Sequence, residues 1–187
     1  VKGFKSDGHD FMQEALARGA AAVVVERRDA LLPGVSWAVV PDTRRALALL
    51  SARFFGNPSA RLKMIGVTGT NGKTTTTTLV GEILKTWFQK VNVVGNIGDP
   101  YTDIAMDTTD QTVTVIELSS FQLETIHNFK PDVSTILNIT PDHLNRHHTM
   151  DNYILMKERI AENQTTSELC ILNYEDEILR SMAERLH

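Results

Sequence analysis

The sequence has little cysteine, no excess of positive charge and no long apolar run. The single cysteine among 187 residues, Cys170, excludes a disulfide within the chain, and the apolar run around it indicates a buried strand residue. The formal net charge of −4 gives no broad basic field, so nucleic acid is not expected as a partner. No apolar run approaches the roughly 20 residues that span a membrane, and no leader peptide is recognisable. We therefore expect a cytoplasmic protein without membrane insertion.

Apolar patterns typical of strands and helices alternate along the chain, whose apolar content of 42% is that of a globular protein. They predict strands at 20–26, 35–40, 62–67, 91–95, 112–118, 133–139 and 168–173, and helices at 11–18, 44–55, 75–88, 121–128 and 151–163. This alternation implies an α/β fold with a mostly parallel sheet, which brings ligands to the carboxyl ends of the strands. Turn residues at 56–59 predict a linker between domains at 1–58 and 59–187.

The segment IGVTGTNGKTTTTT at 65–78 joins a predicted strand to a predicted helix through a glycine turn. Gly69 and Gly72 can adopt backbone angles that point successive N–H groups into one concavity. Lys73 adds a positive charge, and the hydroxyl of Thr74 can complete the coordination of a nucleotide-bound Mg²⁺. Five residues separate the first glycine from the Gly-Lys pair, where the standard P-loop has four. A glycine turn without a ligand is the alternative, but the strand-to-helix context favours an ATP or GTP site.

Glu117 ends a predicted buried strand, where a carboxylate is costly unless it is paired. It either caps the following helix or meets a cation, and a phosphate loop in the same sheet favours the cation. Ser119 and Ser120 can cap that helix in the ordinary way, and Gln122 is an unremarkable helix residue if no site lies nearby.

The segment NITPDHLNRHH at 138–148 follows another apolar strand. In its turn, the imidazole of His143 can bind a metal ion while Asp142 orients it. Zinc would need three or four convergent ligands, which adjacent histidines in a loop supply poorly, and a polar surface loop without a ligand stays open. Lys157 lies four residues after Tyr153 on one helical face, and taken alone it is most simply a solvated charge.

Five separated segments together resemble the Mur ligase family: TGTNGKT at 68–74, GNIG at 95–98, ELSSFQLE at 117–124, NITPDHLNRH at 138–147 and the pair Tyr153 and Lys157. From about residue 80 onward the sequence is most similar to the branch of the family that adds D-glutamate. The first sixty or so residues are similar to the branch that adds diaminopimelate or lysine. The resemblance is therefore that of a mosaic or fused chain.

The resemblance implies ATP-dependent amide bond formation in peptidoglycan precursor synthesis, through an acyl phosphate, with a UDP-muramoyl peptide and an amino acid as substrates. The favoured reaction adds D-glutamate to UDP-N-acetylmuramoyl-L-alanine. Addition of diaminopimelate or lysine to the muramoyl dipeptide is the alternative, and a nucleotide-binding piece without turnover is another.

The resemblance also assigns roles to particular residues. Phosphate binding falls to Gly69, Thr70, Asn71, Gly72, Lys73, Thr74 and Thr75. Two Mg²⁺ sites fall to Thr74, Glu117, His143 and a carbamylated Lys157, and catalytic roles to Lys73, Glu117, His143 and Lys157. Contacts with the muramoyl peptide fall to Asn96, Ser119, Gln122 and His143. The loop that binds the uracil side of the substrate is matched only weakly, by Phe4, Lys5 and Ser6. A family member also has a complete UDP-binding domain and a C-terminal domain. We expect the UDP-binding domain to be partial here, the central domain to be incomplete and the C-terminal domain to be absent. Weak turnover is the expected result.

Overall fold

A computed structural model describes residues 7–27, 34–56 and 62–186 of the chain. The chain divides into two compact units, Val1–Ser51 and Ala52–His187. The division falls within the helix α2 (Thr43–Phe54), ahead of the predicted linker at 56–59, which lies mostly outside the described residues. The segment containing Phe4, Lys5 and Ser6 also lies outside them. The assignment of residues 1–58 to a UDP-binding domain stays a prediction.

The first unit contains a short helical segment, η1 (Gly8–Phe11) and α1 (Met12–Ala17), and two parallel strands, β1 (Ala22–Val25) and β2 (Ser36–Val39). Asp7 caps η1, because its carboxylate accepts a hydrogen bond from the backbone N–H of His9. Glu26, directly after β1, accepts hydrogen bonds from the backbone and the hydroxyl of Thr43, the first residue of α2. These side chains fix the local turns around the strands.

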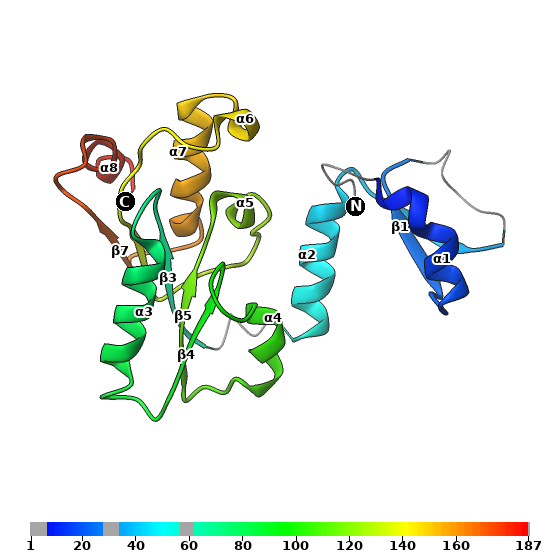
Figure 1. The fold of residues 1–187 in the computed structure, drawn as a ribbon, viewed down its shortest axis with the longest axis horizontal. Helices are drawn as coiled ribbons and strands as arrows, with labels where there is room; N and C mark the ends of the chain where they lie inside the picture. Colours follow the sequence, from blue (N-terminus) through cyan, green and yellow to red (C-terminus); the bar gives the residue numbers. More distant parts are fainter. Residues whose placement is uncertain (1–6, 28–33, 57–61, 187) are drawn as a thin grey trace. The chain divides into compact units, whose positions relative to one another are not determined.

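The second unit is built on a five-stranded sheet in the order β4-β5-β3-β6-β7 (Figure 1). The strands are β3 (Lys63–Thr68), β4 (Lys90–Gly95), β5 (Thr112–Glu117), β6 (Val133–Ile136) and β7 (Leu169–Leu172). Every pair of neighbours is parallel, which confirms the predicted α/β fold. All positions of β5 are buried, as expected for an interior strand of a parallel sheet covered on both faces.

Helices cover both faces of this sheet. They are α3 (Lys73–Leu84), α4 (Tyr101–Ile104) with η4 (Ala105–Asp107), α5 (Ser120–Leu123), α6 (Leu144–His147), α7 (Met150–Glu158) with η5 (Arg159–Ala161), and α8 (Glu177–Ala183). Gly81 of α3 lies against Val93, and a Cβ at Gly81 would stand only 2.2 Å from the Val93 Cγ2. The next strand residue, Val94, points to the opposite face and belongs to the buried core with Leu123, Ile160 and Leu179. The two faces of β4 thus pack against different helices, and the cluster that contains Val94 lies on the face away from α3.

The structure differs from the predicted elements around α5 and α6. The helix expected at 121–128 is a single turn, because the Arg159 guanidinium binds the backbone carbonyls of Glu124 and Ile126 and holds the chain in another path. The segment expected as a turn after Pro141 contains the short helix α6.

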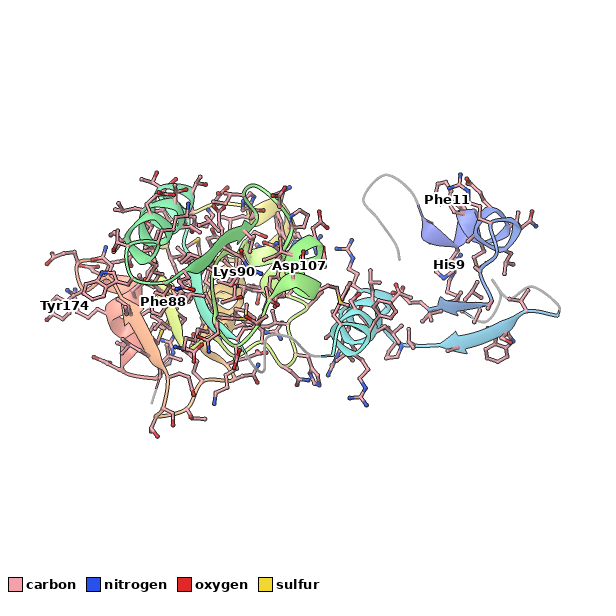
Figure 2. The ribbon with its side chains drawn as sticks, turned by 90° about the horizontal axis from the view of Figure 1, so that it is seen from below. His9, Phe11, Phe88, Lys90, Asp107 and Tyr174 are labelled. Atoms are coloured by element: carbon pink, nitrogen blue, oxygen red, sulfur yellow. The ribbon has the colours of Figure 1, made fainter. Side chains whose placement is uncertain are left out.

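At the amino end of β4, the Lys90 ammonium donates to the carbonyl of Asp107 (Figure 2). Among the residues that the structure describes, every helix lacks the length or the apolar character that a membrane span needs.

Candidate functional site

The glycine turn between β3 and α3 has the geometry of an anion-binding loop. Gly69 and Gly72 have φ values of 148° and 77°, in the region that favours glycine. Gly72 is the N-cap of α3, whose first turn has N–H groups without partners in the helix and carries the positive end of the helix dipole. The Lys73 ammonium donates to the carbonyl of Thr70 at 2.9 Å. The lysine therefore lies back over the loop.

Glu117 is 1% exposed and lies beside this loop at the end of β5. Its Oε2 accepts a hydrogen bond from the Thr74 hydroxyl at 2.9 Å, and its Oε1 accepts one from the Asn96 side chain at 3.0 Å. The sheet register produces this arrangement, because Gly95 pairs with Glu117 at the ends of neighbouring strands and the N–H of Asn96 donates to the Glu117 carbonyl. Ser119, and not Glu117, caps the following helix. A buried carboxylate held by neutral donors is well suited to a cation.

Lys157 on α7 is 2% exposed and points at the same loop. Its ammonium donates to the Gly69 carbonyl at 2.7 Å and to the Thr68 hydroxyl at 3.2 Å, and it lies 5.3 Å from the centre of the Tyr153 ring. Burial, followed by the positive charge of Lys73, lowers the pKa of Lys157 to about 7. The solvated lysine that the sequence alone suggested is thus a buried amine.

His143 is the N-cap of α6, has a left-handed backbone with φ 53°, and its ring is half exposed. The ring lies 4.9 Å from Phe121 and 6.4 Å from Tyr153, measured between ring centres. The Tyr153 hydroxyl is 3.2 Å from the Thr70 hydroxyl of the glycine turn. His143 is therefore next to the site, although no direct bond joins it to Glu117 or Lys157 in the described residues.

His147 and His148 follow His143 in the same segment, and the sequence suggests that they could extend its cluster; within the described residues they form no metal-binding group with it. His147 is buried, its Nε2 lies 2.9 Å from the hydroxyl of Ser120, and burial lowers its pKa. The predicted substrate contacts Ser119 and Gln122 bind one another in a capping box at the start of α5. Both lie on the segment that follows Glu117.

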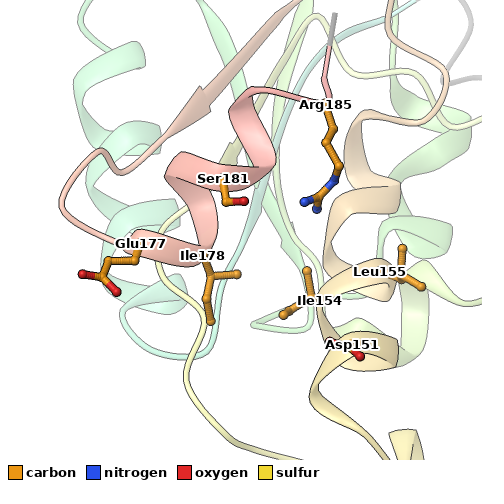
Figure 3. A pocket seen from close by; sticks show the side chains of 7 residues that line it. All are labelled: Asp151, Ile154, Leu155, Glu177, Ile178, Ser181 and Arg185. Carbon is orange, nitrogen blue, oxygen red and sulfur yellow. The ribbon is translucent and has the colours of Figure 1, made fainter.

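The structure thus joins Lys73, Thr74, Glu117, Asn96 and Lys157 around one loop, with His143 beside them. Within the described ranges, no three His, Cys, Asp or Glu side chains converge as a metal-binding group. Mg²⁺ does not require such a group, because it uses one or two carboxylates together with phosphate and water oxygens. A hollow of about 470 Å³ lies elsewhere, between α7 and α8, and none of the predicted site residues lines it (Figure 3).

The sequence pointed to the segment 138–148 through His143, but it assigned no role at the turn to Asn138, Thr140 or Tyr153. Asn138 and Thr140 bind the glycine turn directly, and the Tyr153 hydroxyl contacts the same turn. The N–H of Asn71 donates to the side chain of Asn138, so Asn71 contributes here to the shape of the loop. A signal for this was present, since Asn138 lies two positions past the end of β6, and polar residues after a strand often lie at the ligand edge of a parallel sheet.

Comparison with known proteins gives relatives that share one name, a ligase that adds D-glutamate. The chain is 63% identical over 124 residues to the UDP-N-acetylmuramoylalanine--D-glutamate ligase of Lachnoclostridium phytofermentans, covering 66% of this chain and 27% of that protein. It is 45% identical over 158 residues to the ligase of the same name from Thermoanaerobacter sp., covering 83% of this chain and 35% of that protein. The chain therefore spans about a quarter to a third of the length of these relatives.

A solved structure of MurF ligase from Thermotoga maritima in complex with ADP matches all of this chain with a TM-score of 0.70 and 28% identity, covering 44% of that protein. A MurF structure from Acinetobacter baumannii matches 98% of this chain with a TM-score of 0.69 and 26% identity, covering 42% of that protein. The family model of the Mur ligase middle domain matches residues 67–187, and that of the Mur ligase catalytic domain matches residues 1–55. The predicted resemblance is confirmed, and the chain belongs to the Mur ligase family.

Proposed function

We propose that this chain forms the phosphate-binding part of an ATP-dependent ligase that adds D-glutamate to UDP-N-acetylmuramoyl-L-alanine. The observation that carries the proposal is the bond between the Thr74 hydroxyl and the buried Glu117 carboxylate, next to the glycine turn and two lysines. The names of the relatives support D-glutamate as the amino acid. The origin of the first sixty residues from another branch of the family stays a hypothesis.

In this proposal, the N–H groups of the turn and the start of α3 bind the ATP phosphates. Lys73 exchanges its contact with the Thr70 carbonyl for a terminal phosphate oxygen. Thr74 and Glu117 supply two oxygen ligands that fit Mg²⁺, which would neutralise phosphate charge when bound. These residues act by positioning and by electrostatic stabilisation, which is what phosphoryl transfer mainly requires of a protein.

The second metal site is assigned to His143 and to Lys157 as a carbamate. A carbamate forms when a neutral amine adds to CO₂ and releases a proton, and a pKa of about 7 leaves a large neutral fraction of Lys157 near neutral pH. The product is an anion whose oxygens suit Mg²⁺. In the described residues the unmodified amine instead donates to the Gly69 carbonyl and the Thr68 hydroxyl.

The proposed reaction has two steps. A carboxylate oxygen of the muramoyl peptide forms a bond to the γ-phosphorus while the bond from that phosphorus to ADP breaks. The amine of D-glutamate then attacks the acyl carbon, phosphate leaves and the nitrogen loses a proton. Asn96, Ser119 and Gln122 lie on the two segments that leave the ends of β4 and β5, where polar groups can orient the peptide. A nucleotide-binding piece without turnover stays the alternative.

The first prediction concerns Lys73→Ala, which we expect to weaken Mg·ATP binding at least tenfold, because a charge-assisted contact to phosphate is lost. Calorimetric titration measures the dissociation constant. Lys85→Ala is the matched control, since Lys85 follows the far end of the same helix and pairs with Glu82 at 2.6 Å on the surface. Equal affinity of the folded Lys73→Ala variant and the wild type would contradict the phosphate-loop assignment.

The ligase assignment has its own test. ADP release is measured with Mg·ATP and the two acceptor substrates, UDP-N-acetylmuramoyl-L-alanine and D-glutamate. It is measured again with either of these two substrates left out. We expect release to depend on both acceptors. Release that proceeds equally without D-glutamate would reject D-glutamate as the amino acid, and nucleotide binding without any release would favour the alternative.

A further inference from the structure

The connection between β6 and α6 lies directly against the glycine turn. The N–H of Leu137 donates to the Thr68 carbonyl at 3.0 Å, and the N–H of Thr70 donates to the Asn138 carbonyl at 2.9 Å. A Cβ at Gly69 would stand 3.1 Å from the Leu137 Cβ, so the two backbones are in close contact. The turn is thus supported by a segment far away in the sequence.

The Asn138 side chain extends this support to the outermost part of the turn. Its Oδ1 accepts from the N–H of Asn71 at 2.8 Å, and its Nδ2 donates to the carbonyl of Asn71 at 3.0 Å. One side-chain amide therefore binds both backbone groups of a single loop residue. Asn71 itself is exposed and stands directly before Gly72, the N-cap of α3.

A turn of this composition needs such support. Asn71 is flanked by Gly72 and follows Gly69 by two positions, and glycine lets the backbone adopt many conformations. Only some of these point the N–H groups of the turn toward one anion. If the binding-competent conformation is populated only in part, the observed affinity falls by the same fraction. The two bonds from Asn138 favour one orientation of the Asn71 peptide groups.

We infer that Asn138 is a positioning residue for the phosphates of the nucleotide, acting through Asn71 and without touching the ligand. The inference rests on the proposed function of the turn as a nucleotide site. Thr140 reinforces the arrangement, since its N–H donates to the Thr70 hydroxyl at 3.0 Å. The same connection leads into His143, so one segment positions both the turn and the proposed metal ligand.

The test is Asn138→Ala, which removes both side-chain bonds and keeps the backbone bond to Thr70. We expect the dissociation constants for Mg·ATP and for inorganic tripolyphosphate to rise by the same factor, about tenfold, because the defect lies in phosphate binding. Hydrogen exchange should show faster exchange of the Asn71 amide, while the amides of β5 keep their protection. Asn163→Ala is the matched control, because the Asn163 side chain also binds two backbone groups, the carbonyls of His127 and Phe129 at 3.0 Å each.

A second variant keeps the inference testable if Asn138→Ala does not fold. Asn138→Asp keeps an acceptor for the Asn71 N–H, loses the donor to its carbonyl and adds a negative charge, so we expect affinity to fall at least tenfold. Unchanged affinity in a folded Asn138 variant, or an equal loss in Asn163→Ala, would overturn the inference. If the wild type bound neither probe, the proposed nucleotide site would fail first. Wild-type binding abolished by Lys73→Ala but unaffected by Asn138→Ala would leave that site standing and reject only the role of Asn138.

Discussion

At the scale of single residues, the site concentrates charge that the fold removes from water. Glu117 and Lys157 are both almost fully buried, and neither has the other as a direct hydrogen-bond partner. Glu117 is held by a hydroxyl and an amide, and Lys157 by a carbonyl and a hydroxyl. Such partners satisfy hydrogen bonding without neutralising the charge. Both side chains are therefore expected to respond to charged ligands.

The pKa of Lys157 predicts a pH dependence of stability. Burial lowers this pKa from the ordinary 10.5 to about 7, so the unfolded chain binds more protons between these two values. The free energy of unfolding should rise with pH across the window from about 7 to 10.5, relative to Lys157→Met, by at most about 1.4 kcal/mol per pH unit. Urea unfolding of both proteins at several pH values measures this. Parallel pH profiles of the two proteins would show that the amine is not perturbed.

Glu117→Gln tests the proposed metal ligand. Glutamine keeps one oxygen acceptor for Asn96 and can donate to the Thr74 hydroxyl, so we expect the fold to tolerate it. The charge that would attract Mg²⁺ is lost, and Mg²⁺ should then strengthen ATP binding much less than in the wild type. Titrations with and without Mg²⁺ give the ratio of the two dissociation constants. A ratio equal to that of the wild type would remove Glu117 from the metal site.

At the scale of elements, the close contact of α3 with the sheet positions the phosphate loop. Gly81 lets the helix approach Val93, and the same helix begins at Lys73. Helix propensity alone favours alanine over glycine by about 1 kcal/mol. The contact with the sheet favours glycine instead, because a methyl group at position 81 would lie 2.2 Å from the Val93 side chain.

Gly81→Ala therefore distinguishes packing from propensity. We expect it to destabilise the fold by about 1 to 3 kcal/mol, since overpacking outweighs the gain in propensity. Val93→Ala should recover part of the loss when combined with it, and a double-mutant cycle in urea measures the coupling between the two sites. A stabilised single variant, or strictly additive effects, would show that the helix and the sheet are not in tight contact there.

At the scale of the whole molecule, the predicted site residues that the structure describes belong to the second compact unit. Bound nucleotide stabilises the state that binds it. We expect Mg·ATP to slow hydrogen exchange at 69–75, 117–122 and 138–143 and to leave the exchange of 7–27 unchanged. Mass spectrometry of peptic peptides follows these segments separately. Equal protection of 7–27 would mean that the first unit also responds to the nucleotide.

The sequence by itself determined the parallel α/β sheet, because apolar strands alternate with helices, and the nucleotide turn, because glycines, lysine and threonine stand at one strand-to-helix junction. It also indicated Glu117 and His143, since Glu117 ends one strand and His143 follows another, and the carboxyl ends of these strands meet at one edge. Only the tertiary structure decided the burial of Lys157, the short length of α5 and the contact of Asn138 with Asn71. These features depend on the strand order β4-β5-β3-β6-β7, which sets β6 beside β3 and brings distant side chains to one loop. Local patterns encode the conformation of each segment, whereas bonds between distant segments exist only after the sheet has assembled.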